Sequence, residues 1–420
     1  MSTMTITLLF FAFAIVMFVT EKIPLALTSM IVCIGLIITG VLTSSEAFAG
    51  FINSNVVLFV AMFVVSGALF ETGMANEIGG LVTKFAKTER QCIVLLMILT
   101  GTMSGFMSNT GTAAIFIPII LGIAAESGYS RARLLLPMVL ASAMGGNLSL
   151  IGAPGNLIAQ TGIEPLGLRY GFFEYAKVGI PILVVGILYF AFVGYKLLPN
   201  TKSESSSNTE KLDFSHIPSW KKKTSLIVLV VAVIAMVFED VIGIKLHISA
   251  SIAALFLILT NVITERQAYD SIDLQTIFLF GGTLALANAI EITGAGTALA
   301  DFVIGLLGKN ASPFVLLAAI FLLAVTLTNF MSNTATTALL VPISISIAQG
   351  MGADPRAVVM ATVIGGSCAY ATPIGMPANT MIFSVGGYKF NDYVKAGLPL
   401  IVVSSIVSLI LLPIFFPFYP

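Results

Sequence analysis

Two identical polar tripeptides occur in a chain that is otherwise strongly apolar. They are Ser108-Asn109-Thr110 and Ser332-Asn333-Thr334, and they lie 224 positions apart. Their hydroxyl and amide oxygens can bind a small hard cation such as sodium, and their hydroxyl and amide hydrogens can bind an anion. Ser, Asn and Thr are also favoured helix N-caps, so either tripeptide alone could simply cap a tight turn. The same three residues in both halves favour a binding role, because a turn needs only one polar residue of several kinds.

A second pair of features interrupts two long apolar segments, 134–163 and 357–388. The interrupting residues are Gly152, Pro154, Gly155 and Asn156 in the first segment, and Pro373, Gly375, Pro377 and Asn379 in the second. Proline removes a helical hydrogen bond and clashes with the preceding turn. Unwound backbone at membrane depth is tolerated only where protein or a water-filled cavity satisfies it. We therefore expect the two breaks and the two tripeptides to meet at one site.

The charge around the tripeptides bears on the ligand. Neither 91–125 nor 310–353 contains Lys or Arg. An anion bound there would be held by helix N-termini and hydrogen bonds, and co-bound cations would offset its charge. This pattern predicts a cation-coupled anion symporter rather than a uniporter.

Composition defines the elements that must position these residues. Hydrophobic residues make up 57% of the 420 residues and charged residues 10%, whereas soluble domains carry about 25% charge. Long apolar runs without alternation exclude a membrane β-barrel. A net charge of zero gives no indication of a basic surface that could bind nucleic acid.

The segments 91–125 and 310–353 are too long for one span of about 20 residues. We expect each to turn back at its tripeptide as a re-entrant hairpin.

The chain contains an internal repeat. Residues 106–114 align with 330–338 at a shift of 224, and seven of the nine positions are identical. Each half then holds five spans and one hairpin, and an odd number of spans places the halves in opposite directions. Such inverted-topology repeats are typical of secondary transporters.

The expected fold is an all-α polytopic membrane protein of ten transmembrane helices and two re-entrant hairpins. Its parts are a first repeat (1–198), a linker (199–223) and a second repeat (224–420).

The distribution of basic residues orients this fold. With the linker 199–223 in the cytoplasm, fifteen Lys and Arg residues lie inside and five outside, as the positive-inside rule requires. We therefore expect a protein of the cell membrane with both termini outside. The hairpin 91–125 would open from the cytoplasm and the hairpin 310–353 from outside.

The two Ser-Asn-Thr tripeptides, the proline–asparagine breaks and the Gly-Gly-Tyr-Lys-Phe stretch at 386–390 resemble one known family. It is the divalent anion–sodium symporter family of the ion transporter superfamily, which includes dicarboxylate and sulfate carriers. The resemblance covers essentially the whole chain. It implies a homodimer, an elevator-type movement, and sodium-driven import of an anion such as succinate, malate or sulfate, with sodium as coupling ion and no cofactor.

The resemblance also implies roles for individual residues. It places one sodium ion at Ser104, Ser108, Asn109 and the backbone of Gly152, and a second at Thr328, Asn333 and the backbone of Gly375. It places the anion at Asn109, Thr110, Asn333 and Thr334. The family's breaks often read Ser/Thr-Pro-Pro-Asn, but Ala153 and Met376 stand at the hydroxyl positions here. Sulfate or another small oxyanion therefore stays open beside the dicarboxylates.

Other functions are less well supported. A sodium/proton antiporter, or an arsenite- or citrate-type carrier of the same superfamily, is the alternative transporter. A proton antiporter should place a buried Asp or Glu beside the tripeptides, and the sequence offers none. An intramembrane protease needs Ser with His, or two Asp, within spans, and neither pair occurs. We therefore expect no enzymatic activity.

Overall fold

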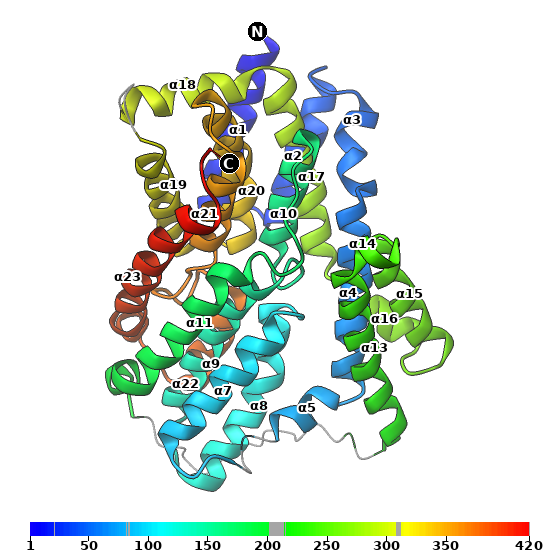
Figure 1. Cartoon of the computed structure of the whole chain (residues 1–420), viewed down its shortest axis with the longest axis vertical. Coiled ribbons are helices and arrows are strands. Elements are labelled where there is room, and N and C mark those ends of the chain that lie inside the picture. Colours follow the sequence, from blue (N-terminus) through cyan, green and yellow to red (C-terminus); the bar gives the residue numbers. More distant parts are fainter. Residues whose placement is uncertain are drawn as a thin grey trace.

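The computed structural model describes residues 1–20, 22–80, 82, 85–200, 214, 216–307 and 312–419. Within them, every regular element is a helix (Figure 1). The first half contains α1 (Thr3–Thr20), α2 (Leu25–Ile38), α3 (Ser44–Phe48), α4 (Ser54–Glu71), α5 (Met74–Gly79), α7 (Glu89–Ser104), α8 (Asn109–Ser127), α9 (Arg131–Gly145), α10 (Pro154–Ile163), α11 (Ala176–Tyr189) and α12 (Tyr195–Leu197).

The second half contains α13 (Ser219–Val237), α14 (Glu239–Ile242), α15 (Leu246–Leu259), α16 (Glu265–Asp270), α17 (Leu274–Ile292), α18 (Ala295–Leu307), α19 (Pro313–Thr328), α20 (Asn333–Gly350), α21 (Pro355–Gly366), α22 (Pro377–Gly386) and α23 (Phe390–Phe415). The helix order of the first half recurs. The capping does too, because Thr43 caps α3 and Thr264 caps α16 through the same reciprocal capping box. A left-handed glycine follows α4 and another follows α17, Gly73 (φ 75°) and Gly294 (φ 71°).

Six helical stretches in the described residues are long and apolar enough to cross a membrane. They are Thr3–Thr20, Ser44–Glu71, Asn109–Ser127, Ala176–Leu197, Leu274–Ile292 and Phe390–Phe415. Four shorter apolar helices accompany them: α2, α15, α19 and α21. The all-helical fold with several membrane-spanning helices therefore agrees with the expected class.

The predicted linker differs from the structure at its C-terminal end. Helix α13 already begins at Ser219, directly after Pro218, so Trp220 and Lys221–Lys223 belong to its first turns. Proline favours the start of a helix, and Lys and Trp anchor helix ends at a membrane interface. Residues 201–213 and 215 of the linker lie outside the described residues.

The helices pack into two units that each draw on both halves of the chain. In the outer unit, α17 packs along α2, α15 along α4, and α13 and α1 complete it. In the inner unit, α7 packs on α9, α19 on α21, and α10 on α20, with α8, α11, α22 and α23 around them. Helices α9 and α21 form the centre of the inner unit, because nearly all of their residues are buried.

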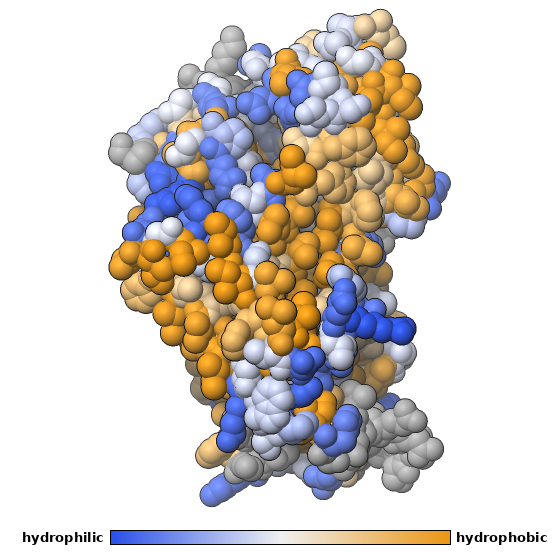
Figure 2. All heavy atoms as spheres, turned by 90° about the vertical axis from the view of Figure 1, so that its right-hand side faces the viewer, coloured by the Kyte–Doolittle hydropathy of each residue, from blue (hydrophilic) through white to orange (hydrophobic). Residues whose placement is uncertain are grey.

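The surface of the outer unit is apolar, as expected of a face in contact with lipid. Figure 2 shows hydrophobic side chains across the middle of one face, with hydrophilic ones toward the lower end and on one upper side. Large exposed hydrophobic residues follow α13 and α15: Ile227, Val230, Val231, Ile234, Ile248, Ile252, Leu255, Phe256 and Leu259. Soluble monomers rarely expose such continuous apolar surface.

Candidate functional site

The two tripeptides start α8 and α20, as expected. Serine provides the cap in both: the hydroxyl of Ser108 accepts from the backbone N–H of Gly111 at 3.1 Å, and that of Ser332 accepts from Ala335 at 3.2 Å. Asn109 and Asn333 are therefore the first helical residues and not the caps. Their side-chain amides are free for other contacts, which weakens the interpretation of the asparagines as turn residues.

Each asparagine is bonded to the last residue of the preceding helix. Ser104 Oγ donates to Asn109 Oδ1 at 2.7 Å, and Thr328 Oγ1 donates to Asn333 Oδ1 at 2.7 Å. Both hydroxyl residues are fully buried. The Nδ2 of Asn109 points to the second half of the chain, where it donates to the sulfur of Met376 at 3.8 Å.

Oxygen atoms converge around Asn333. Its Oδ1 lies 3.1 Å from Gly366 O and 3.2 Å from Gly375 O, and all three atoms are acceptors. The single proton of the Thr328 hydroxyl is within hydrogen-bond reach of both Asn333 Oδ1 and Gly366 O, and it can serve only one of them. Two arrangements relieve this conflict: a rotated amide that presents its NH₂ group, or a cation between the oxygens. Freed carbonyls of broken helices are typical sodium ligands in transporters.

The first half contains a related cluster. A Cβ atom on Gly152 would lie 2.5 Å from Gly146 O and 3.1 Å from Gly105 O. A Cβ atom on Gly146 would lie 2.8 Å from Asn109 Oδ1. Glycine is required at position 152, since two backbone carbonyl oxygens approach it so closely, and at Gly146 the close neighbour is the side chain of Asn109. The predicted sodium ligands Ser104, Asn109 and Gly152 are therefore brought together.

The two predicted helix breaks are present and are held in the same way. The Nδ2 of Asn156 donates to Gly146 O at 2.9 Å and Ser149 O at 2.7 Å. The Nδ2 of Asn379 donates to Ala369 O at 2.8 Å and Thr372 O at 3.0 Å. Both asparagines are fully buried. They satisfy carbonyls of the unwound segments that precede α10 and α22.

The two Ser-Asn-Thr tripeptides form the tips of the expected hairpins, and we call them the tips. The tips and the two helix breaks line one cavity of about 780 Å³. Of the predicted residues, Ser108, Asn109, Thr110, Pro154, Asn333, Thr334 and Pro377 line it. Ser104, Gly152, Asn156, Thr328, Gly375 and Asn379 are not among its lining residues. This arrangement places the predicted anion contacts on the cavity wall.

Several lining residues were missed by sequence reasoning. They are Asp273, Gln275, Thr276, Thr337, Ser367, Met376 and Thr380. Asp273 is an acidic residue of the cavity wall, but it is exposed and is not the buried Asp or Glu that a proton antiporter should place beside the tripeptides. It precedes α17, far from either tripeptide in sequence, so no local pattern could place it there.

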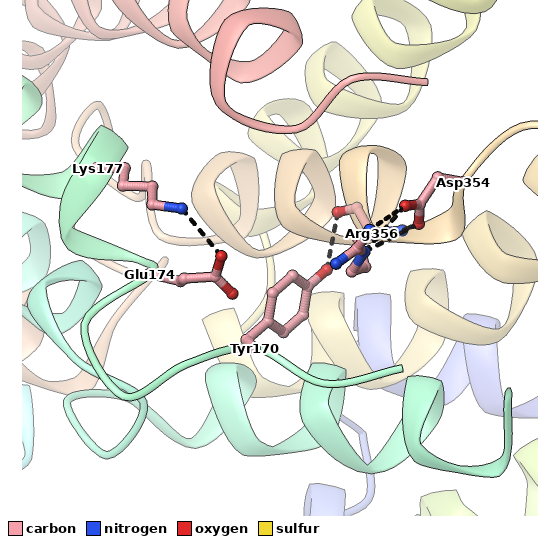
Figure 3. Close-up of polar contacts among 5 residues, drawn as sticks. All are labelled: Tyr170, Glu174, Lys177, Asp354 and Arg356. Carbon is pink, nitrogen blue, oxygen red and sulfur yellow. Dashed lines mark hydrogen bonds and ion pairs between the residues drawn. The ribbon is translucent and has the colours of Figure 1, made fainter. Parts of the chain in front are cut away.

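Two buried tyrosines hold the halves of the inner unit together. Tyr170, between α10 and α11, donates through its hydroxyl to the carbonyl of Arg356 at the start of α21, at 2.8 Å (Figure 3). Tyr388, between α22 and α23, donates to the carbonyl of Ala132 at the start of α9. Each half thus anchors the central helix of the other. Beside Tyr170, ion pairs Lys177–Glu174 (2.9 Å) and Arg356–Asp354 (2.6 Å) order the same surface.

An all-helical fold with membrane-spanning helices, paired breaks and one shared polar cavity defines a multi-pass membrane transporter. Residues 15–365 match the family described as citrate transporter (CitMHS), and the chain belongs to this family. The predicted membership of a divalent anion–sodium symporter family is thereby confirmed, and the family consists of transporters rather than enzymes.

Relatives extend over nearly the whole chain. The sodium-dependent dicarboxylate transporter SdcS of Staphylococcus aureus (strain USA300) is 26% identical, over 93% of this chain and 82% of its own. The transporter YfbS of Escherichia coli (strain K12) is 23% identical, over 97% and 98%. Two solved structures share the fold. They are YdaH of Alcanivorax borkumensis (TM-score 0.67, 15% identity, 88% and 87% coverage) and MtrF of Neisseria gonorrhoeae (TM-score 0.64, 16%, 92% and 86%).

Proposed function

We propose that this protein is a sodium-coupled secondary transporter that imports a divalent anion. The shared cavity carries the proposal, because both Ser-Asn-Thr tripeptides line it and its described lining residues include no Lys or Arg. An anion bound there needs a co-bound cation to offset its charge. The name of the relative SdcS, a sodium-dependent dicarboxylate transporter, supports both the ion and the substrate class.

The proposed anion site is the cavity wall formed by Asn109, Thr110, Asn333 and Thr334. The described lining residues include no Lys or Arg, so neutral donors hold the anion and bound sodium offsets its charge. Candidate substrates are dicarboxylates such as succinate and malate, citrate, and sulfate. Sulfate stays in this set because Ala153 and Met376 supply no hydroxyl to the wall.

The proposed sodium sites lie at and behind this wall. The first consists of Ser104, Ser108, Asn109 and Gly152. The second consists of Thr328, Asn333 and Gly375, and we add the carbonyl of Gly366 to it because that oxygen lies 3.1 Å from the Asn333 amide. The two asparagines belong to both the sodium and the anion sites, so each amide can couple the two binding events.

The proposed topology is ten spans and two re-entrant hairpins in an inverted repeat. In Figure 1, α7 and α8 lie in the lower half of the molecule and α19 and α20 in the upper half. Their tips nevertheless line one cavity, which supports hairpins that enter from opposite sides. The linker 199–223 would be cytoplasmic and both termini outside the cell membrane. The outer unit would stay fixed as the scaffold of a homodimer, as the family resemblance implies, while the inner unit moves as an elevator.

A second candidate is a proton-coupled carrier, such as a sodium/proton antiporter or an arsenite- or citrate-type carrier. The observation in its favour is the carboxylate of Asp273 in the cavity wall. For a proton-coupled anion carrier, a pH gradient without sodium should drive anion uptake, whereas sodium coupling predicts that it does not. A sodium/proton antiporter should instead exchange sodium for protons in the absence of any of these anions.

Uptake into proteoliposomes tests the proposal. Labelled succinate, citrate and sulfate are supplied with an inward sodium gradient, with a proton gradient alone, or with neither. We expect saturable uptake of at least one anion that requires sodium. Ser104→Ala and Thr328→Ala remove one oxygen each near a proposed sodium site, so both should raise the sodium concentration for half-maximal uptake several-fold.

The matched control is Thr326→Ala. Thr326 lies on α19 two residues before Thr328, is exposed, and donates only to Leu322 O of its own helix. Its sodium dependence should equal that of the unaltered protein. Sodium-independent uptake, or an unchanged sodium dependence in both site variants, would contradict the proposed coupling.

A further inference from the structure

Among the described residues that line the 780 Å³ cavity, Asp273 is the one with an ionisable side chain. It stands between α16 and α17, on the outer unit, whereas the tips of α8 and α20 belong to the inner unit. Its side chain is exposed, and no ion pair to it occurs in the described part of the chain. A bound anion therefore shares the cavity with a carboxylate that forms no ion pair among the described residues.

Helix capping does not explain the charge. Asp273 Oδ1 accepts from the backbone N–H of Thr276 at 3.2 Å, so the residue is the N-cap of α17. The corresponding helix of the first half, α4, is capped by Asn53, whose Oδ1 accepts from Asn55 N at 2.8 Å. Asn and Asp are nearly equal caps. The fold thus needs an oxygen at this position but not a negative charge.

A negative charge in the cavity has opposite effects on the two ligands. It repels an approaching anion and raises the local concentration of cations. The neutral donors of the tips cannot cancel this repulsion, whereas sodium ions bound beside the tips can. The effect acts over a distance of about 8 Å at physiological ionic strength, so it reaches across part of the cavity without a direct contact.

We propose that Asp273 is a coupling residue that makes anion binding depend on sodium already bound. It is a specificity-determining residue of the proposed transport cycle, because its negative charge weakens the binding of an anion when no sodium is bound. The proposal rests on the sodium-coupled function proposed above. It adds that part of the coupling lies on the outer unit, away from the residues that hold either ligand.

Three variants separate the charge from the cap. Asp273→Asn keeps the cap and removes the charge, whereas Asp273→Glu keeps the charge and is a poorer cap. Asp270→Asn removes an equal charge three residues earlier on α16, outside the cavity lining. Purified full-length protein is titrated with succinate, citrate and sulfate at low and high sodium, with choline chloride holding the ionic strength constant. Ligand-induced shifts of the melting temperature give the apparent Kd.

The measured quantity is the ratio of the anion Kd at low sodium to that at high sodium. We expect Asp273→Asn to lower this ratio several-fold, mainly through tighter anion binding at low sodium. Asp273→Glu and Asp270→Asn should keep the ratio of the unaltered protein. An unchanged ratio in Asp273→Asn, an equal fall in Asp270→Asn, or a fall in Asp273→Glu as large as in Asp273→Asn would overturn the proposal. A ratio near one in the unaltered protein would instead overturn the sodium-coupled function, and the role of Asp273 with it.

Discussion

At the scale of single residues, the side-chain amides of Asn109 and Asn333 are not needed to cap their helices. Ser108 and Ser332 cap the helices, which leaves the amides of Asn109 and Asn333 for ligands. Asn109 accepts from Ser104 and donates to the sulfur of Met376. A thioether is a weak acceptor, so an anionic oxygen can readily replace it as the partner of the amide.

This arrangement predicts the effect of changing either asparagine. Asn109→Asp and Asn333→Asp remove the donor and add a negative charge beside the anion. Anion uptake should fall tenfold or more, which corresponds to about 1.4 kcal/mol or more. Asn→Ser keeps a donor and an acceptor with shorter reach and should retain weak uptake.

The measurement is initial uptake into proteoliposomes, normalised to the amount of inserted protein. Asn391→Asp makes the same change at an exposed position in the first turn of α23 and should transport normally. Near-normal uptake by well-inserted Asp variants at the tips would show that the asparagines do not contact the substrate.

At the scale of elements, the two breaks are supported by one repeated motif. In each half a buried asparagine two residues after a proline bonds two carbonyls of the unwound segment. A buried tyrosine then bonds the asparagine's own carbonyl: Tyr175 to Asn156 at 2.8 Å, and Tyr393 to Asn379 at 2.7 Å. The breaks are thus fixed structures that can hold ligand atoms in place.

Removal of such a support should destabilise the protein. Asn379→Ala leaves two buried carbonyls without donors, at about 1–3 kcal/mol each, and Asn156→Ala should do the same. Tyr393→Phe removes one hydrogen bond and should cost about 1 kcal/mol. The melting temperature in detergent should therefore fall more for either Asn→Ala variant than for Tyr393→Phe. A smaller fall for Asn379→Ala than for Tyr393→Phe would contradict this account of the break.

At the scale of the whole molecule, polar contacts join the outer and inner units. The Nδ2 of Asn55 on α4 donates to Thr161 Oγ1 at 2.9 Å and to Glu164 Oε1 at 3.1 Å on α10 and the turn after it. Arg169 and Asp240 form an exposed ion pair at 3.2 Å between the same units. The proposed elevator movement would have to break these contacts.

A reversible cross-link tests this movement. In a background without Cys33, Cys92 and Cys368, Asn55→Cys with Thr161→Cys is oxidised to join the two units. Uptake should stop and return after reduction, because the units can no longer slide. The control pair is Thr72→Cys with Ser225→Cys, whose hydroxyls lie 3.0 Å apart within the outer unit, and it should leave uptake unchanged. Continued transport by the fully cross-linked 55–161 pair would exclude a relative movement of the units.

The sequence alone determined the features that depend on local chemistry. Apolar composition predicted the membrane class, since hydropathy acts on each segment separately. The repeated tripeptides predicted the starts of α8 and α20, and the prolines predicted the two breaks, because capping and proline geometry operate within one helical turn. The partners of Asn156 and Asn379 also lie within ten residues, so the support of the breaks is local as well.

Only the tertiary structure decided which distant residues meet. Asp273 faces a cavity whose other walls are the tips, and Met376 lies 267 residues from Asn109, which donates to its sulfur. Tyr170 of the first half donates a hydrogen bond to the second half, and Tyr388 of the second half donates one to the first half. Periodicity tells which face of a helix is buried but not what covers that face. These contacts follow from the packing of two interleaved halves, which fixes distances that no local pattern contains.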